Sequence, residues 1–308
     1  MKKTCFKVIY ILVLIALLIG IISILISLYN NKNDSNEKLQ ITTTIFPYYS
    51  IANEICYENA NIVMLIKPGA ENHTYEPTTE DIVTIKNSDV FIYTGGESDK
   101  WVEKIISSID PEKTKIIKIM DYIEPMQVDH HGEVSYDEHV WTSLKNTCII
   151  AEKLNEVVCE INPDLKDKYT DNTYKFIEEL NSLDMQFKEV IENSNKTVVF
   201  ADRFPFSYFA RDYDLKYISA FESCAEEAEP SIHSMTNIIN TINQQNIKNV
   251  FYIEFSNQKI ADSVCDETGT NKLLFHSCHN ISQEDFDNGV TYLSLMENNL
   301  RNIKEAIE

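Results

Sequence analysis

Hydrophobic and polar positions alternate along much of the chain in a pattern that predicts strands separated by helices. Short apolar, partly β-branched runs typical of buried strands lie, in chain order, at 41–46, 61–66, 89–93 and 113–119. Segments with helical spacing follow the first three of these runs, at 47–56, 78–87 and 99–108. Such alternation is typical of βαβ crossovers, in which helices cover a parallel sheet. With a further helix expected at 143–159, these elements predict a first α/β lobe over residues 39–160.

The same alternation returns in the last third of the chain and predicts a second lobe over residues 196–308. Its strand-type runs lie at 196–200, 216–221, 249–254 and 272–276. Its helical segments lie at 206–212, 231–245, 257–268 and 291–307. The two lobes are therefore expected to share one architecture.

A long helix is predicted between the lobes, over residues 161–195. Asn162 and Pro163 provide a cap followed by proline at the first helical position. From there to Asn193 the chain has no glycine and no further proline, and apolar residues recur at steps of three and four. A coiled-coil helix would show the same periodicity, but the α/β pattern resumes directly after it. The predicted fold class is α/β: two lobes, each a mainly parallel four-stranded sheet with flanking helices, joined by one long rigid helix.

The amino-terminal segment follows a different pattern, because residues 8–29 carry no charge and are preceded by Lys2, Lys3 and Lys7. This run is long enough to span a membrane, with the lysines in the cytoplasm and the rest of the chain outside. A cleaved signal peptide usually has a shorter apolar region and a small-residue cleavage site, and residues 27–30 offer no clear one. We expect residues 1–38 to be an uncleaved transmembrane signal anchor and tether, with a cleaved signal as the alternative.

Composition and motif content argue against several classes of function. The formal net charge is −21, whereas nucleic-acid partners require basic patches. The chain has only seven glycines and lacks G-x-S-x-G, H-E-x-x-H and a phosphate-binding glycine loop, so an enzyme is not expected. Six of the seven cysteines follow the apolar segment, which is compatible with disulfides in an exported protein. No C-x-x-C motif is present, which argues against a cysteine zinc knuckle.

Three histidines lie where the predicted strands end or loops begin, and these are candidate metal ligands. His73 lies in a loop bracketed by glycine and proline between a strand and a helix, and loops at the carboxyl ends of strands line ligand-binding crevices. His139 follows two acids, and His276 ends a second-lobe strand. Neutral imidazoles grouped with carboxylates suit zinc, while a larger share of carboxylates favours manganese. His233, within a predicted helix, is expected to be a surface or packed residue.

Two motifs, GAENHTYEPT at 69–78 and DEHVW at 137–141, resemble the histidine motifs of the zinc/manganese substrate-binding proteins of bacterial ABC transporters. This is the cluster A-I, or metal-binding lipoprotein, family, and the resemblance runs in order over residues 39–308. It implies a monomer that captures zinc, or alternatively manganese, in a cleft between the lobes and delivers it to an ABC permease in the membrane. It also implies that the long helix limits hinge closure. Relatives often carry a lipid-attachment cysteine after the apolar run, but here the only nearby one, Cys5, precedes it.

The resemblance carries His73 and His139 over directly, whereas the second-lobe ligands depart from the family pattern. Relatives have His or Glu at the third position, where this chain offers Asp202. The fourth ligand is commonly an Asp after the last strand, but this chain has no acid there and His276 is expected instead. Cys278 competes for that role, unless it pairs with Cys224 in a disulfide.

The expected site therefore consists of His73, His139, His276 and Asp202, a set that suits zinc better than manganese. Glu254 matches a family acid near the cleft and is expected either to orient a ligand histidine or to anchor Arg203. The residues around His130 and His131 resemble a shortened form of the His/Asp-rich loop of zinc-specific relatives, or a solvated turn.

Two functions of other classes remain as alternatives at this point. One is a surface adhesin in which metal binding is incidental, since some relatives have been described in that way. The other is a zinc hydrolase with Glu71 or Glu138 as its base, which would need an open coordination position for water.

Overall fold

The structure is a computed structural model that describes residues 17–23, 38–70, 75–130, 133–221 and 230–307. The chain divides into two compact units, Met1–Lys38 and Leu39–Glu308. In the first unit, residues 17–23 are helical, and most of the predicted anchor lies outside the described residues. Within the described ranges, the structure contains no helix that is both long and apolar enough to cross a membrane.

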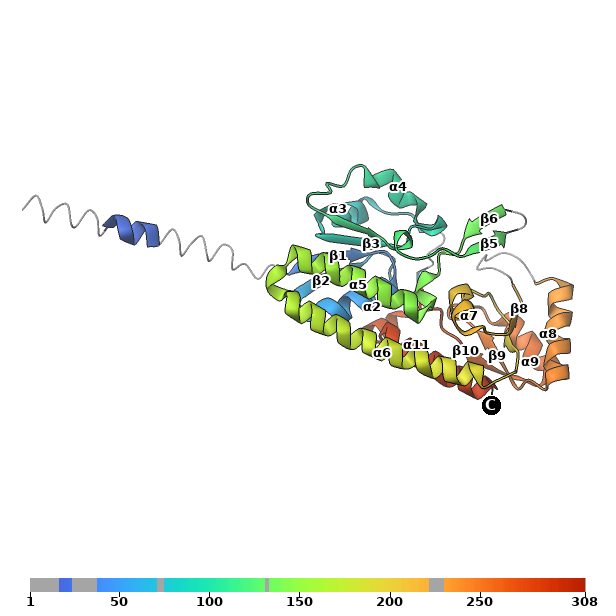
Figure 1. The fold of residues 1–308 in the computed structure, drawn as a ribbon. Helices are drawn as coiled ribbons and strands as arrows, with labels where there is room; N and C mark the ends of the chain where they lie inside the picture. Colours follow the sequence, from blue (N-terminus) through green and yellow to red (C-terminus); the bar gives the residue numbers. More distant parts are fainter. Residues whose placement is uncertain (1–16, 24–37, 71–74, 131–132, 222–229, 308) are drawn as a thin grey trace, which may run out of the picture. The chain divides into compact units, whose positions relative to one another are not determined.

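The larger unit begins with a parallel four-stranded sheet in the order β2-β1-β3-β4, which is drawn in blue to teal in Figure 1. Its strands are β1 (Leu39–Thr43), β2 (Ala60–Met64), β3 (Val90–Tyr93) and β4 (Lys115–Lys118). Helices connect successive strands: α2 (Phe46–Cys56), α3 (Thr79–Asn87) and α4 (Lys100–Ile106). Every residue of β3 is buried, as expected for a central strand covered on both faces.

The start of α3 shows how local sequence sets these boundaries. The Thr78 amide donates to Asp81 Oδ2 (2.7 Å), and the Asp81 amide donates to Thr78 Oγ1 (3.2 Å). This reciprocal capping box satisfies two amides that have no partner within the helix. The helix start predicted at Thr78 is thus confirmed.

The second sheet is also parallel and four-stranded, in the order β10-β9-β7-β8. Its strands are β7 (Val198–Phe200), β8 (Tyr217–Ser219), β9 (Asn249–Tyr252) and β10 (Asn271–Leu274). Its helices are α7 (Ser207–Tyr213), α8 (Ile232–Gln245), α9 (Lys259–Thr268), α10 (Gln283–Asp287) and α11 (Tyr292–Ile307). Gly269 ends α9 in the left-handed conformation (φ 70°), and its amide donates to Cys265 O (2.8 Å).

Two helices, α5 (Leu144–Ile161) and the 27-residue α6 (Lys166–Glu192), connect the sheets. In Figure 1, α6 runs beside α5 and α11, and both helices contact it. The buried positions of α6 recur at the predicted steps, at Tyr169, Thr173, Phe176, Leu180, Leu183, Phe187 and Ile191. The main hydrophobic core includes residues of both sheets and of α6. The predicted fold class is confirmed.

The clearest departure from the sequence prediction is the segment around His130, which was expected to be a polar loop. It contains two antiparallel strands, β5 (Gln127–His130) and β6 (Glu133–Tyr136). The pattern did not reveal them because each strand is only four residues long and has few apolar residues, so no clear alternation marks it. Short 3₁₀ segments complete the described elements: η1 (Tyr57–Asn59), η2 (Glu97–Asp99), η3 (Ile119–Asp121), η4 (Val140–Thr142) and η5 (Pro163–Leu165).

Candidate metal centre

His139 lies directly before η4 and is only 6% exposed. Its Nδ1 lies 2.6 Å from Asp137 Oδ1, and its backbone amide donates to the same oxygen (2.9 Å). An ionised carboxylate only accepts hydrogen bonds, so the ring proton is on Nδ1 and the lone pair is on Nε2. Zinc-binding histidines are commonly held by a carboxylate in this way. His139 is therefore in the tautomer that binds a metal through Nε2.

Asp137 keeps its charge although it is buried. Burial raises the pKa of this carboxyl, but the adjacent His139 ring and the hydrogen bonds from His139 outweigh burial, and the pKa lies below its ordinary value. Tyr208 fixes the same segment, because its hydroxyl donates to the backbone carbonyl of Asp137 (3.0 Å). The anion that orients His139 is therefore present at neutral pH.

A second histidine, His279, lies beside His139. Their ring centroids are 5.7 Å apart with the ring planes at 88°, and His279 also lies 4.8 Å from the Trp141 ring. Two imidazoles bound tetrahedrally to one zinc at ~2.1 Å place their centroids roughly 5 Å apart. His139 and His279 thus have a spacing that suits two ligands of one ion. His279 lies three residues after His276 in the same loop, and it was not among the candidate ligands predicted from the sequence.

His276 is buried as deeply as His139, at 6% exposure, but its ring is used in another way. The Cys278 amide donates to His276 Nδ1 (2.9 Å). Because a backbone N–H is always a donor, Nδ1 holds the lone pair and the neutral ring carries its proton on Nε2. Neither nitrogen then offers a lone pair to a metal ion. This geometry argues against the predicted ligand role of His276.

Two acids of the second lobe accept hydrogen bonds from backbone amides near the carboxyl ends of the strands. Asp202, which follows β7, accepts from the amides of Arg203 (2.8 Å, Oδ1) and Ile253 (3.3 Å, Oδ2). Glu254 accepts from the Ser277 amide (2.8 Å), and its Oε2 lies 3.7 Å from His276 Nδ1. Glu254 was expected either to orient a histidine or to anchor Arg203. The structure shows it beside His276 and hydrogen-bonded to the next residue of the same loop. Asp202 is 6% exposed and occupies the sheet edge expected of a ligand.

The remaining candidates are placed as follows. His73 and His131 lie outside the described residues, and His233 is exposed in α8 as predicted. In the described part of the chain, no three His, Cys, Asp or Glu side chains come close enough together to hold a metal ion. Among the described residues, the imidazole rings of His139 and His279 lie close together.

Cys278 is a weak competitor for zinc. The described cysteines are free thiols: Cys56, Cys148, Cys159, Cys265 and Cys278. Burial, and then the negative charge of Glu254, raise the pKa of Cys278 well above its ordinary value. Zinc binds the thiolate, which this environment disfavours. Cys278 is a free thiol here, and its suggested disulfide partner Cys224 lies outside the described residues.

Glu138, which was considered as a hydrolase base, is buried against η2. It accepts from the Ser98 amide (3.0 Å) and hydroxyl. Gly96 makes this approach possible, because a Cβ there would lie 2.3 Å from Glu138 Oε2. Nearby Asp99 has its pKa raised to about 6, first by burial and also by the charge of Glu138, although the Thr94 and Gly95 amides donate to it. Glu138 thus has a structural role in holding this turn.

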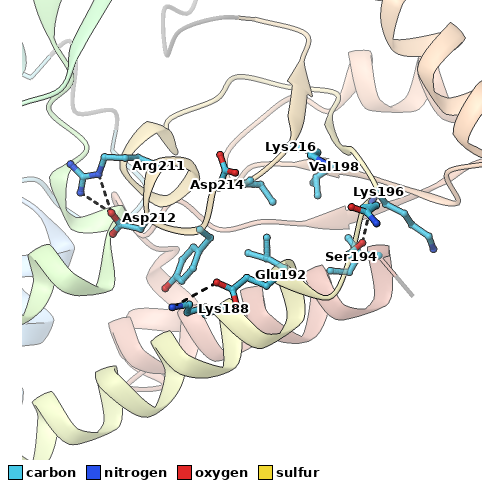
Figure 2. A pocket seen from close by; sticks show the side chains of 14 residues that line it. Lys188, Glu192, Ser194, Lys196, Val198, Arg211, Asp212, Asp214 and Lys216 are labelled. Atoms are coloured by element: carbon cyan, nitrogen blue, oxygen red, sulfur yellow. Dashed lines mark hydrogen bonds and ion pairs between the residues drawn. The ribbon is translucent and has the colours of Figure 1, made fainter.

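A cavity of about 410 Å³ lies at the end of α6 and is shown in Figure 2. Its lining carries charges of both signs that pair with each other, at Lys188–Glu192 (3.7 Å) and Arg211–Asp212 (2.8 Å). None of the described residues that line it is a histidine or a cysteine. The cavity therefore lacks the donors of a zinc site.

Comparison with known proteins gives consistent results. Residues 41–306 match the family model of ZnuA, described as zinc-uptake complex component A, periplasmic. The zinc-binding lipoprotein AdcA of Streptococcus pneumoniae R6 is 28% identical over 290 residues, which cover 91% of this chain and 58% of AdcA. The high-affinity zinc uptake system protein ZnuA of Bacillus subtilis is 25% identical over 288 residues, covering 90% of each chain. The chain thus spans little more than half of the AdcA length.

Solved structures match the fold over most of the chain. The Zn(II)-bound ZnuA-like domain of S. pneumoniae AdcA superposes with a TM-score of 0.73 at 28% identity, covering 88% of this chain and 99% of the domain. The metal-dependent lipoprotein YcdH of B. subtilis gives a TM-score of 0.76 at 25% identity, with coverage of 88% and 99%.

Proposed function

Because the chain belongs to the ZnuA family of zinc-uptake components, we propose that it captures zinc outside the cytoplasm and delivers it to an ABC permease. The observation that carries this proposal is the pair of His139, held by Asp137 in the ligand-competent tautomer, and His279 beside it. The family is one of solute-binding proteins, as predicted, and not of enzymes. In the part of the chain that the structure describes, no side-chain arrangement favours the adhesin or the hydrolase alternative.

The proposed zinc shell combines residues of both lobes. His73 and His139 would come from the first lobe, and Asp202 would supply an oxygen from the second. Asp202 must move towards the two histidines when zinc binds, because no three such side chains of the described residues lie close enough to hold a metal ion. His279 takes the position that the sequence interpretation assigned to His276, because the Cys278 amide occupies His276 Nδ1. Three imidazoles and one carboxylate suit tetrahedral zinc better than manganese, which prefers more oxygen donors. We therefore propose zinc as the cargo in preference to manganese.

We also propose a role for each segment of the chain. Residues 1–38 would hold the protein at the outer face of the membrane as a monomer, and residues 39–160 and 196–308 would each supply one side of the site. Residues 161–195, which contain α6, would join the two lobes. The S. pneumoniae relative is a lipoprotein, which supports a membrane-attached protein on the outer face.

Metal analysis tests this proposal. The unit Leu39–Glu308 would be purified without added metal, loaded, and titrated with zinc and manganese in competition. One zinc per chain, retained against an excess of manganese, is the expected result. Displacement of zinc by manganese would contradict the cargo assignment, and the absence of stoichiometric metal would contradict the function.

A further inference from the structure

The loop that carries His279 is tied to the first lobe by Asn280, which is only 5% exposed. Asn280 Nδ2 donates one hydrogen bond to Lys67 O (2.9 Å) and one to Ala70 O (2.8 Å). Its Oδ1 accepts from the Ile281 amide (2.9 Å). In the same place the Gly69 amide donates to Ile281 O (2.8 Å). Three hydrogen bonds thus join residues 67–70 to residues 280–281 across the lobes.

A second attachment holds the other side of His279. Trp141 Nε1 donates to Ser277 O (2.9 Å), and the Tyr292 hydroxyl donates to Trp141 O (2.6 Å). His279 therefore lies between two fixed points of its loop, one at Trp141 and one at residues 67–70. Trp141 also contacts the rings of His139 and His279, so a change there would alter the metal site itself. Asn280 is therefore the better attachment to remove, because its side chain donates to first-lobe carbonyl oxygens, whereas the Trp141 ring contacts both histidine rings.

The amide group is specifically suited to this position. Both groups that it meets on the first lobe are carbonyl oxygens, which require a donor with two N–H bonds on one nitrogen. A carboxylate of the same shape would place oxygen against oxygen. Without a donor, two carbonyl groups at this partly buried junction lose their side-chain partner, which is unfavourable.

We propose that Asn280 is a positioning residue that holds the two sides of the metal site together and sets the rate at which zinc leaves. This inference rests on the proposed function, in which zinc bridges His139 of the first lobe and His279 of the second. Separation of those two rings moves the His279 loop away from residues 67–70 and must break the Asn280 hydrogen bonds. The continuous core along α6 opposes wide hinge opening, so these local bonds control release.

Zinc dissociation, followed by stopped-flow transfer to a chelator, tests the proposal in the full chain. Asn280→Ala and Asn280→Asp are each expected to accelerate dissociation at least tenfold, with the association rate changed less than about twofold. The same substitutions at Asn302 provide the matched control. Its Nδ2 also donates to a backbone carbonyl, Leu274 O (2.7 Å), but within the second lobe, and its variants should release zinc at the wild-type rate.

The Asp variant separates positioning from charge, because an added anion alone would slow the release of a cation. Amide hydrogen exchange at Gly69, measured on the zinc-free protein, separates this proposal from the proposed function. Exchange at Gly69 should accelerate at least tenfold in Asn280→Ala and remain unchanged in Asn302→Ala. Unchanged exchange at Gly69, or unchanged zinc dissociation in both Asn280 variants, would overturn the proposal. Failure of the wild-type protein to bind zinc would instead overturn the function.

Discussion

His139 and His276 are equally buried and each lies a few residues after a strand, β6 and β10 respectively. They nevertheless use Nδ1 in opposite ways. At His139, Nδ1 donates to the carboxylate of Asp137, which leaves the Nε2 lone pair for a metal. At His276, Nδ1 accepts from the Cys278 amide, which places the proton on Nε2. Two histidines with the same burial thus differ in which ring nitrogen carries the proton, and the partner of Nδ1 makes the difference. We expect this partner to separate ligand from non-ligand histidines at this site.

Removal of His139 should produce the largest effect on binding. His139→Ala is expected to weaken zinc affinity at least 100-fold, about 2.7 kcal/mol, because it removes a pre-oriented ligand. Competition with a chromophoric chelator measures the affinity, and circular dichroism checks that the fold is retained. An affinity within threefold of wild type in a folded variant would remove His139 from the site.

Asp137→Asn tests whether the tautomer matters, because it keeps the shape of the side chain and removes the charge that orients His139. Loss of such a carboxylate partner typically costs 10- to 100-fold in metal affinity. We expect a loss in that range by the same chelator competition. Asp89→Asn is the control, since Asp89 accepts a backbone amide of the first lobe, from Gln40 (2.8 Å). A loss no greater than that of the control would show that Asp137 is only structural.

Asp99 extends the comparison to buried acids, because its pKa is raised to about 6 where that of Asp137 is lowered. A carboxyl with a folded pKa above its unfolded value destabilises the fold at pH above about 6, and the penalty disappears as the pH falls towards 4. Asp99→Asn should therefore raise the free energy of unfolding by about 2 kcal/mol at pH 7.5 and change it little at pH 4. Urea unfolding at both pH values measures this. Equal differences at the two pH values would contradict the charge argument.

The smallest binding effect is expected within the loop that contains both second-lobe histidines. His279→Ala should lower zinc affinity about tenfold, or 1.4 kcal/mol, because one of four ligands is lost. His276→Ala should leave affinity within about threefold, since Asn299 holds the backbone of residue 276 and not its ring (2.7 and 2.8 Å). Calorimetric titration of both variants checks this pair. The reverse order of the two affinities would restore His276 as the ligand.

The fold was predictable because its signals are repeated and local. Apolar steps in α6, the cap at Thr78 and the stop at Gly269 each follow from neighbouring residues. The antiparallel pair β5 and β6 was not predicted, since few apolar residues mark it.

The hydrogen-bond partners of the candidate histidines were predictable only in part, for a physical reason. His139 lies two residues after Asp137, so the motif already contains the acid that accepts from its Nδ1. The use of His276 depends on Cys278, whose left-handed conformation (φ 61°) accompanies the return of its amide to the ring. That conformation is uncommon for a residue other than glycine, and the neighbouring sequence contains no signal that predicts it. His279 contacts His139 across the two lobes, and the periodicity of apolar residues along the sequence cannot predict such a contact.

We expect zinc to bind Nε2 of His139 and a ring nitrogen of His279, while His276 retains its proton on Nε2. Nitrogen-15 NMR of the histidine side chains, recorded without and with one equivalent of zinc, tests this claim directly. The Nε2 resonance of His139 and one ring-nitrogen resonance of His279 should move to metal-bound positions, and His276 should keep a protonated Nε2 in both states. Movement of the His276 resonance on zinc addition, with that of His279 unchanged, would contradict this claim.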